Sequence, residues 1–266
     1  MRDYVVAVPS YKRAEILKEQ TLNTLDRLCA DRERIHVFVA DDAEREVYED
    51  ALNGEYRIVV GVRGISSQRK YYHEYFPEGT RIISLDDDIA DLMEKQDNTI
   101  ETTGYTLDQI ADIAYAVCEK HDARLWGINP VANGFYMKDQ ITVGLRFICA
   151  NFMGSYAGDW VYTDPQRRMT PTGEDHHSTL RSYTRYGNVV RLEYLTPKTR
   201  YWAKGGIDAC VTEDGETRAE RHARQLKRVS DLYPNLATPT VRKGIISSLK
   251  LKPITNARYV RGSIKP

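Results

Sequence analysis

The chain has 266 residues, of which 41% are hydrophobic and 29% charged, values that suit a soluble domain with a real core and exclude a fibrous or mostly disordered protein. No stretch approaches about 18 uninterrupted apolar residues, and the N-terminal apolar run is too short for a secretory signal. We therefore expect a cytoplasmic protein without a membrane span. Its cysteines lie far apart with no Cys-x-x-Cys pair, so we expect reduced core thiols: Cys29, Cys118, Cys149 and Cys210.

The formal net charge is zero, but the charge is unevenly distributed along the sequence. Residues 216–266 contain 12 Lys or Arg and 3 Asp or Glu, a balance of +9, so the rest of the chain carries −9. A basic end on an acidic protein is typical of a segment that binds a polyanion, and such binding weakens as salt rises. The alternative is a solvated basic surface.

The first hundred residues alternate between short apolar runs and segments with helical spacing. Apolar runs at 4–8, 35–42, 56–62 and 81–89 predict buried strands, and helices are expected over 16–29 and 107–117. This alternation predicts a mainly parallel α/β sheet. Ligands bind such sheets at the carboxyl ends of the strands, where Ser10, the Asp41-Asp42 pair and residues 86–88 fall.

The second half has a different pattern. Segments 126–137, 140–155 and 187–197 resemble hairpin strands rather than crossover units. We find no repeat and no linker. The sequence therefore predicts one domain over residues 1–215, with a donor half at about 1–100 and an acceptor half at about 101–215. A basic, helical extension at 216–266 is expected to pack on the same domain.

Three adjacent carboxylates, Asp86, Asp87 and Asp88, follow the apolar run 81–85. Strand interiors disfavour Asp and the charges repel one another, so a hard divalent cation would explain the cluster. Alternation along a strand would place Asp86 and Asp88 on one face, between the protein and a diphosphate. The alternative is a turn that ends in a helix N-cap at Asp88.

The segment 63–70, Arg-Gly-Ile-Ser-Ser-Gln-Arg-Lys, precedes that cluster. Gly64 permits a tight turn, and a serine after it can cap a helix whose free N–H groups attract phosphate. Arg63, Arg69 and Lys70 add positive charge for the same anion. A solvent-facing basic helix start is the competing interpretation.

In their order along the chain, these motifs resemble those of GT-A-fold glycosyltransferases of the family 2 type. The resemblance rests on residues 5–13, 41–42, 64–70 and 85–89 and on Gly-Glu-Asp at 173–175. More closely, the chain resembles phage glycosyltransferases encoded beside Tet/JBP-type dioxygenases, a group thought to add sugars to hydroxymethylated bases in DNA. The resemblance implies a GT-A-like fold, and host-cell cytosol as the location if a phage encodes the chain.

The resemblance also implies roles for individual residues on the donor side. The base and ribose of a UDP-sugar would contact Pro9, Ser10, Tyr11 and Arg13, with Asp41 or Asp42 on the base or ribose. Arg69 would hold the diphosphate, beside Arg63 and Gly64, which the segment 63–70 itself indicates for the same anion. Asp86 would span a ribose hydroxyl and a Mn²⁺ or Mg²⁺ ion, with Asp87 beside it and Asp88 on the metal. Pro9-Ser10 and Asp41-Asp42 are equally compatible with a strand stop and an N-cap.

Sugar transfer to a hydroxyl needs a general base near the acceptor. In inverting members of the resembled family, the Asp of a Glu-Asp pair is this base. The resemblance therefore implies Asp175 as the first candidate for the general base and Glu174 as the second. Adjacent histidines follow. They cannot both face one site, so we assign the histidine metal ligand that is common in GT-A enzymes to His177, with His176 as the alternative. A surface pair is the competing interpretation.

The stretch 216–234 predicts an amphipathic helix, with Arg221, Arg224 and Arg228 opposite its apolar stripe. We interpret these arginines as contacts to a DNA backbone, and a basic cover for the sheet is the alternative. The predicted function is metal-dependent transfer of glucose from UDP-glucose to a hydroxymethylpyrimidine in double-stranded DNA, 5-hydroxymethylcytosine above all. The alternatives are a protein or small-molecule acceptor, a nucleotidyltransferase, and a degenerate transferase fold that only binds DNA.

Overall fold

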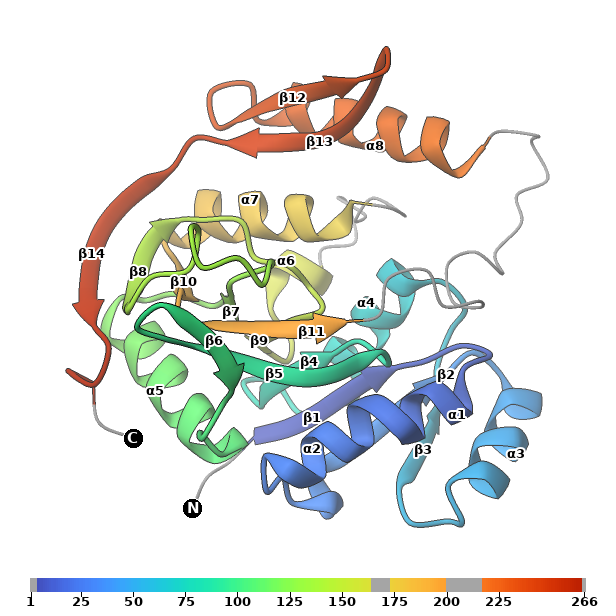
Figure 1. Ribbon diagram of the computed structural model, residues 1–266. Helices are drawn as coiled ribbons and strands as arrows, with labels where there is room; N and C mark the ends of the chain where they lie inside the picture. The colour runs from blue at the N-terminus through green and yellow to red at the C-terminus, as the bar shows by residue number, and fades with distance from the viewer. Residues whose placement is uncertain (1–3, 164–172, 200–216, 265–266) are drawn as a thin grey trace.

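The computed structural model in Figure 1 describes residues 4–163, 173–199 and 217–264. A nine-stranded sheet forms the centre of this described part. Its strands, in spatial order, are β14 (Ile254–Val260), β8 (Gln140–Leu145), β10 (Val189–Leu192), β7 (Trp126–Ile128), β9 (Phe152–Tyr156), β4 (Arg81–Leu85), β1 (Tyr4–Pro9), β2 (Ile35–Val39) and β3 (Arg57–Val60).

One end of the sheet is the parallel half predicted from the sequence. Strands β4, β1, β2 and β3 pair in parallel, and helical crossovers connect them as their alternating apolar runs indicated. The crossovers are a helical segment made of α1 (Ala14–Leu17), the π-helix η1 (Lys18–Leu22) and α2 (Asn23–Arg27), then the single turn η2 (Arg32–Arg34), α3 (Asp42–Ala51) and α4 (Ile65–Tyr75). The carboxyl ends of these strands therefore meet at one edge of the sheet.

The other end of the sheet is mixed, and its pairing differs from the predicted hairpins. Strands β8 and β9 do not pair with each other: β8 lies between β10 and β14, whereas β9 lies between β7 and β4. Strand β11 (Leu195–Thr199) leaves the central sheet altogether. The hairpin prediction for 126–137, 140–155 and 187–197 was wrong because local alternation indicates a strand but contains no information about its distant partner.

A second sheet continues directly from the acidic cluster. Strand β5 (Ile89–Gln96) pairs with β6 (Thr99–Thr102) on one side and with β11 on the other, all antiparallel. Its buried side chains join a core that includes the predicted helix α5 (Leu107–Lys120), which begins with a capping box at Thr106 and Gln109. The packed core thus fixes the place where β5 begins, immediately after Asp88.

The C-terminal extension is only partly helical. The predicted amphipathic helix is α8 (Arg218–Leu232), which packs near α7 (Glu174–Tyr186); α6 (Trp160–Thr163) precedes α7. The chain then forms the hairpin β12 (Ala237–Arg242) and β13 (Ile245–Leu251), followed by β14, which is the edge strand of the central sheet. Figure 1 shows this red segment wrapping from above α7 down to the sheet edge. The extension is therefore an integral part of the fold.

Two smaller expectations can also be compared with the structure. Cys118 is buried as expected, but Cys29 is exposed and Cys149 only partly buried, while Cys210 lies outside the described residues. Of the helices that the structure describes, none combines the length and the apolar character that crossing a bilayer requires.

Candidate active site

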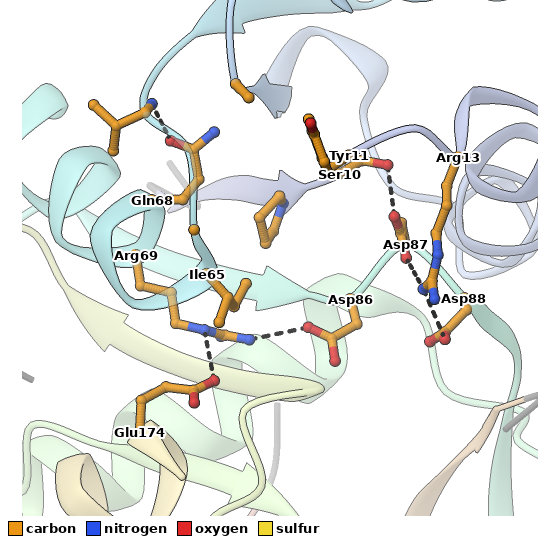
Figure 2. A pocket seen from close by; sticks show the side chains of 14 residues that line it. Ser10, Tyr11, Arg13, Ile65, Gln68, Arg69, Asp86, Asp87, Asp88 and Glu174 are labelled. Carbon is orange, nitrogen blue, oxygen red and sulfur yellow. Dashed lines mark hydrogen bonds and ion pairs between the residues drawn. The ribbon is translucent and has the colours of Figure 1, made fainter. Parts of the chain in front are cut away.

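A cavity of about 150 Å³ opens at the carboxyl edge of the parallel strands. Figure 2 shows its side chains converging from the ends of β1 and β4, from the start of α4 and from the first residue of α7. The motifs that the sequence singled out in the two halves therefore meet in one place. The lining residues are Pro9, Ser10, Tyr11, Arg13, Ala40, Val62, Gly64, Ile65, Gln68, Arg69, Asp86, Asp87, Asp88 and Glu174.

The loop after β1 is held by a tyrosine that the sequence analysis did not identify. The Tyr48 hydroxyl, fully buried on α3, accepts a hydrogen bond from the Arg13 backbone N–H at 3.0 Å and lies 2.7 Å from the Ser10 hydroxyl. Ser10 in turn donates to Asp87 Oδ2 at 2.6 Å. This chain of bonds connects α3, the loop and the acidic cluster. In the sequence, Tyr48 looks like any other buried residue of a helix.

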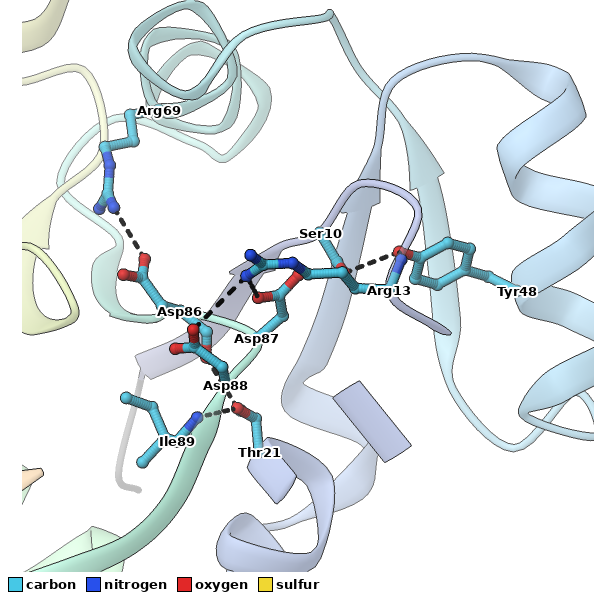
Figure 3. Close-up of polar contacts among 9 residues, drawn as sticks. All are labelled: Ser10, Arg13, Thr21, Tyr48, Arg69, Asp86, Asp87, Asp88 and Ile89. Atoms are coloured by element: carbon cyan, nitrogen blue, oxygen red, sulfur yellow. Dashed lines mark hydrogen bonds and ion pairs between the residues drawn. The ribbon is translucent and has the colours of Figure 1, made fainter. Parts of the chain in front are cut away.

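The three aspartates lie in the turn between β4 and β5 rather than on a strand, since β4 ends at Leu85. The alternation expected for a strand therefore does not apply. Asp86 accepts a bond from Arg69 at 3.0 Å, whereas Arg13 Nη1 lies 3.2 Å from Asp87 Oδ1 and 3.4 Å from Asp88 Oδ2. Figure 3 shows Asp86 turned toward Arg69, and Asp87 and Asp88 toward Arg13.

The electrostatics of this turn reflect burial and repulsion. Burial raises the pKa of Asp86 to about 6, against the opposing effect of Arg69 and with a further upward contribution from Asp88. Burial likewise raises the pKa values of Asp87 and Asp88, while Arg13 acts to lower both. The turn thus holds carboxylates that positive charge would stabilise in their ionised form.

Arg69 lines the cavity between the acidic turn and the start of α7. Its side chain is only 3% exposed, and its guanidinium donates to the Ala150 carbonyl at 3.0 Å and to Asp86. Its Nε lies 3.7 Å from Glu174 Oε1. Arg69 was predicted to bind a diphosphate; in the structure it lines the cavity and links the acidic turn to the start of α7.

Gln68, which the sequence analysis also missed, fixes the neighbouring loop. Its Oε1 accepts from the Val62 N–H at 2.8 Å, and its Nε2 donates to the Val39 carbonyl at 2.9 Å. A Cβ at Gly61 would lie 2.2 Å from Gln68 Oε1, so a larger residue there would displace the Gln68 amide from these bonds. Gly64, with φ of 96°, begins α4 at the pocket, and the Arg63 guanidinium lies 5.4 Å from the centre of the Tyr11 ring.

The two acidic residues that begin α7 occupy different environments. Glu174 lines the cavity, and its pKa is raised to about 7 by burial and by the neighbouring charge of Asp175, against the effect of Arg69. Asp175 accepts bonds from the His176 backbone N–H at 2.8 Å and from its ring Nδ1 at 3.2 Å. Although burial acts to raise it, these bonds hold the pKa of Asp175 below its usual value. The geometry therefore favours Glu174 over Asp175 as the residue that faces a ligand.

Neither histidine is among the residues that line the cavity. The His176 ring stacks on Phe147 with centroids 4.2 Å apart, and the buried His177 ring lies edge-on to Tyr233, 6.2 Å away, beyond the end of α8. Within the described ranges, no group of three or more His, Cys, Asp or Glu side chains has a metal-binding arrangement. We therefore leave His177 out of the site.

The Asp41-Asp42 pair lies outside the pocket lining, which includes Ala40 instead. Asp41 caps α3 by accepting from the Glu44 N–H at 3.0 Å, and Asp42 pairs with Arg45 on the exposed face of that helix. Helix capping, the alternative that the sequence left open, accounts for this pair.

The arginines predicted to contact DNA lie on α8, away from the cavity lining. Arg224 and Arg228 are exposed, and with Lys227, Asp231 and Leu232 they line a shallow depression on this helix. Arg221 is half-buried and is not among the residues that line this depression.

Comparison with known proteins gives a fold but no sequence family. No protein-family model matches the chain, and no curated protein sequence does. Similar solved structures include glucosyl-3-phosphoglycerate synthase from Mycobacterium tuberculosis in complex with phosphoglyceric acid (TM-score 0.53, 9% identity, 96% of this chain and 88% of that chain). Complexes of that synthase with UDP and with Mn²⁺, UDP-glucose and glycerol 3-phosphate each give a TM-score of 0.51 at 8% identity, over 97% of this chain and 89% of that chain. At these identities the likeness establishes architecture alone, and it confirms the predicted GT-A-like α/β fold.

Proposed function

We propose that the protein is a divalent-metal-dependent glycosyltransferase that transfers a sugar from a UDP-sugar to an acceptor hydroxyl. The observation that carries this proposal is the convergence of the Asp86–Asp88 turn, the Ser10–Arg13 loop and Glu174 on one cavity at the carboxyl edge of the sheet. The shared fold supports it, since one of the similar structures is a complex with Mn²⁺ and UDP-glucose.

The acidic turn has the right chemistry for the metal. Mn²⁺ and Mg²⁺ prefer carboxylate oxygens and retain positions for water and phosphate oxygens. Asp86 and Asp88 both line the cavity and are partly exposed, and each has a pKa raised by burial. We assign these two as the protein's ligands, and the bound cation would neutralise the charge that develops on the leaving diphosphate.

The donor nucleotide would occupy the space between β1 and α4. Pro9, Ser10 and Tyr11 face it from one side, and the N-terminal turn of α4 faces it from the other. Free N–H groups at a helix N-terminus attract phosphate, and Arg63 beside Tyr11 adds positive charge. Asp87 is largely occupied by Ser10 and Arg13, so we assign it to holding this loop in place for the nucleotide.

Glu174 is our candidate for the general base, with Asp175 as the alternative that the family resemblance implies. A base with a pKa near 7 is well matched to deprotonating a hydroxyl at neutral pH. The acceptor oxygen would attack the anomeric carbon while its proton passes to the Glu174 carboxylate. The bond from that carbon to the UDP oxygen breaks, and UDP leaves. A single displacement of this kind inverts the anomeric configuration, which NMR of the product measures.

For the finer identity of the substrates, we propose glucose as the sugar and the hydroxymethyl group of 5-hydroxymethylcytosine in double-stranded DNA as the acceptor. Two features support this acceptor: the order of motifs shared with the phage enzymes and the +9 balance of residues 216–266. Exposed Arg224 and Arg228 on α8 offer charge to a phosphate backbone.

One experiment tests both the glycosyltransferase activity and the proposed acceptor. It combines the protein with UDP-glucose, Mn²⁺ and duplexes that contain cytosine, 5-hydroxymethylcytosine or 5-hydroxymethyluracil. Digestion to nucleosides and mass spectrometry then detect a hexose-sized gain on a hydroxymethylated base. Release of UDP without any gain on DNA would move the acceptor to protein or a small molecule. In a parallel reaction that contains a nucleoside triphosphate and a sugar 1-phosphate in place of UDP-glucose, release of pyrophosphate would identify a nucleotidyltransferase. Absence of turnover and of metal-dependent UDP binding would contradict the enzyme itself.

A further inference from the structure

One threonine side chain bridges the two ends of the acidic turn. Thr21 lies on the π-helix η1 and is fully buried. Its hydroxyl donates to the Asp86 carbonyl at 2.7 Å and accepts from the Ile89 backbone N–H at 3.0 Å. Figure 3 shows Thr21 next to Ile89, beside the turn that carries the three carboxylates.

This arrangement differs from that of an ordinary four-residue turn. In a closed four-residue turn the carbonyl of the first residue accepts directly from the N–H of the fourth. In the segment 86–89, the Thr21 hydroxyl is bonded to both of these groups. A side chain from another element thus sets the spacing between the two ends of the turn. This spacing in turn sets the directions in which the Asp86 and Asp88 side chains project.

The helix that supplies Thr21 is suited to hold it rigidly. Leu17, Leu22 and Leu25 anchor this helix in the main core, and the wider π-turn over Lys18–Leu22 is a feature often found beside functional sites. The branched Cβ of threonine restricts its rotamer. Both properties reduce the freedom of the hydroxyl, so the turn that it holds is pre-organised.

We propose that Thr21 is a positioning residue for the metal site: its hydroxyl sets the separation of the Asp86 and Asp88 carboxylates and thereby the affinity for the divalent cation. This inference rests on the proposed function, which assigns these two carboxylates to the metal. Partners that orient ligating carboxylates commonly change metal affinity by about 10- to 100-fold when they are removed.

Thr24 provides a matched control on the same helical segment. It too is fully buried, and its hydroxyl donates to the backbone of the same strand, at the Ile89 carbonyl, with a distance of 2.9 Å. That carbonyl follows the turn, so the bond does not connect the two ends that Thr21 connects. Replacing either threonine by valine removes one buried hydroxyl and keeps the shape.

The experiment compares wild-type protein, Thr21→Val, Thr21→Ser and Thr24→Val. Mn²⁺ affinity in the presence of UDP is measured from the EPR signal of the free ion, and thermal unfolding is followed by circular dichroism. We expect Thr21→Val to weaken Mn²⁺ binding at least about tenfold, and Thr21→Ser to recover most of that loss. Thr24→Val should lower the melting temperature as much as Thr21→Val does and leave Mn²⁺ affinity unchanged.

Equal Mn²⁺ affinities in Thr21→Val and wild type, or equal losses in Thr21→Val and Thr24→Val, would overturn the positioning role and leave the proposed function intact. If wild-type protein with UDP does not bind Mn²⁺, the proposed function fails, and this inference fails with it. Should Thr21→Val not fold, Thr21→Cys, whose thiol is a weak hydrogen-bond partner, takes its place with the same expected loss.

Discussion

The two ends of the central sheet differ in how far apart in the sequence their paired strands lie. In the parallel half, single helical crossovers connect β1 to β2 and β2 to β3, and these strands pair with each other. Only β4, which follows β3 and α4 in the chain, pairs on the other side of β1. In the mixed half, β8 pairs with β10 and with β14 near the C-terminus, and β9 pairs with β4 of the parallel half. The first half can be inferred from local patterns, whereas the second depends on contacts between distant segments.

The candidate site lies at the junction between these halves, where β4 pairs with β9. The Asp86 N–H donates to the Asn151 carbonyl across this junction, and Arg69 spans from Asp86 to Glu174. The parallel half supplies the Ser10–Arg13 loop and the acidic turn, and the mixed half supplies the carboxylate proposed as base. Binding of the donor and transfer of the sugar should therefore be separable by mutation.

The largest effect is expected on the donor side, from Asp88→Asn. Loss of a carboxylate from the proposed metal site should lower UDP-glucose turnover about 10³-fold, since electrostatic stabilisation of the leaving group is usually a dominant contribution. Metal-dependent UDP affinity, measured by calorimetry, should fall with it. Asp42→Asn, a change of the same kind at an exposed position outside the cavity, is the control and should leave both unchanged. If Asp88→Asn preserves turnover, the turn does not hold the metal.

Next in size is the effect of Glu174→Gln on the acceptor side. Removing a general base costs about 10²- to 10⁴-fold in rate, and donor affinity should change little. Because the pKa of Glu174 is raised to about 7, the residue is protonated and inactive as a base below that pH. Wild-type kcat should therefore rise with pH through about 7, and this dependence should disappear in Glu174→Gln. A larger rate loss in Asp175→Asn than in Glu174→Gln would reverse the assignment.

A third prediction concerns the stability of the mixed half. Arg261, just beyond β14, forms an ion pair with Glu94 of β5, whose side chain is only 2% exposed. Arg261→Ala leaves that carboxylate buried without its partner, and we expect a loss of about 3 kcal/mol of unfolding free energy in urea titration. Arg258→Ala, at an exposed position within β14, should cost less than about 0.5 kcal/mol. Equal losses would mean that the pair does not anchor the extension.

The smallest effect is expected on α8. Replacing exposed Arg224 and Arg228 by alanine should weaken binding to a hydroxymethylated duplex. The slope of log affinity against log salt concentration should become shallower by up to about two, because up to two fewer counterions are released. Fluorescence anisotropy over a range of salt concentrations measures both quantities. The half-buried Arg221 should contribute less. Unchanged DNA binding in the double variant would make α8 a cover over α7 and nothing more.

The sequence alone determined the α/β class, the parallel half and the approximate position of the acidic turn. These depend on local properties: apolar runs of strand length, helical spacing between them, and polar residues where parallel strands end. The helix near the C-terminus was also predictable, because its apolar stripe has helical spacing and Thr217 with Glu220 forms a capping box.

Only the tertiary structure decided the pairing of the mixed half, the addition of β14 to the central sheet and the surroundings of each carboxylate. Asp41 and Asp88 are both acidic residues after a strand, yet one caps a helix and the other lines the cavity. Glu174 and Asp175 are adjacent, yet their pKa values are shifted in opposite directions. Such differences arise from burial and from partners such as Arg69 and Tyr48, which are distant in sequence. The physical reason is that desolvation and charge pairing depend on three-dimensional proximity, which a local sequence pattern does not specify.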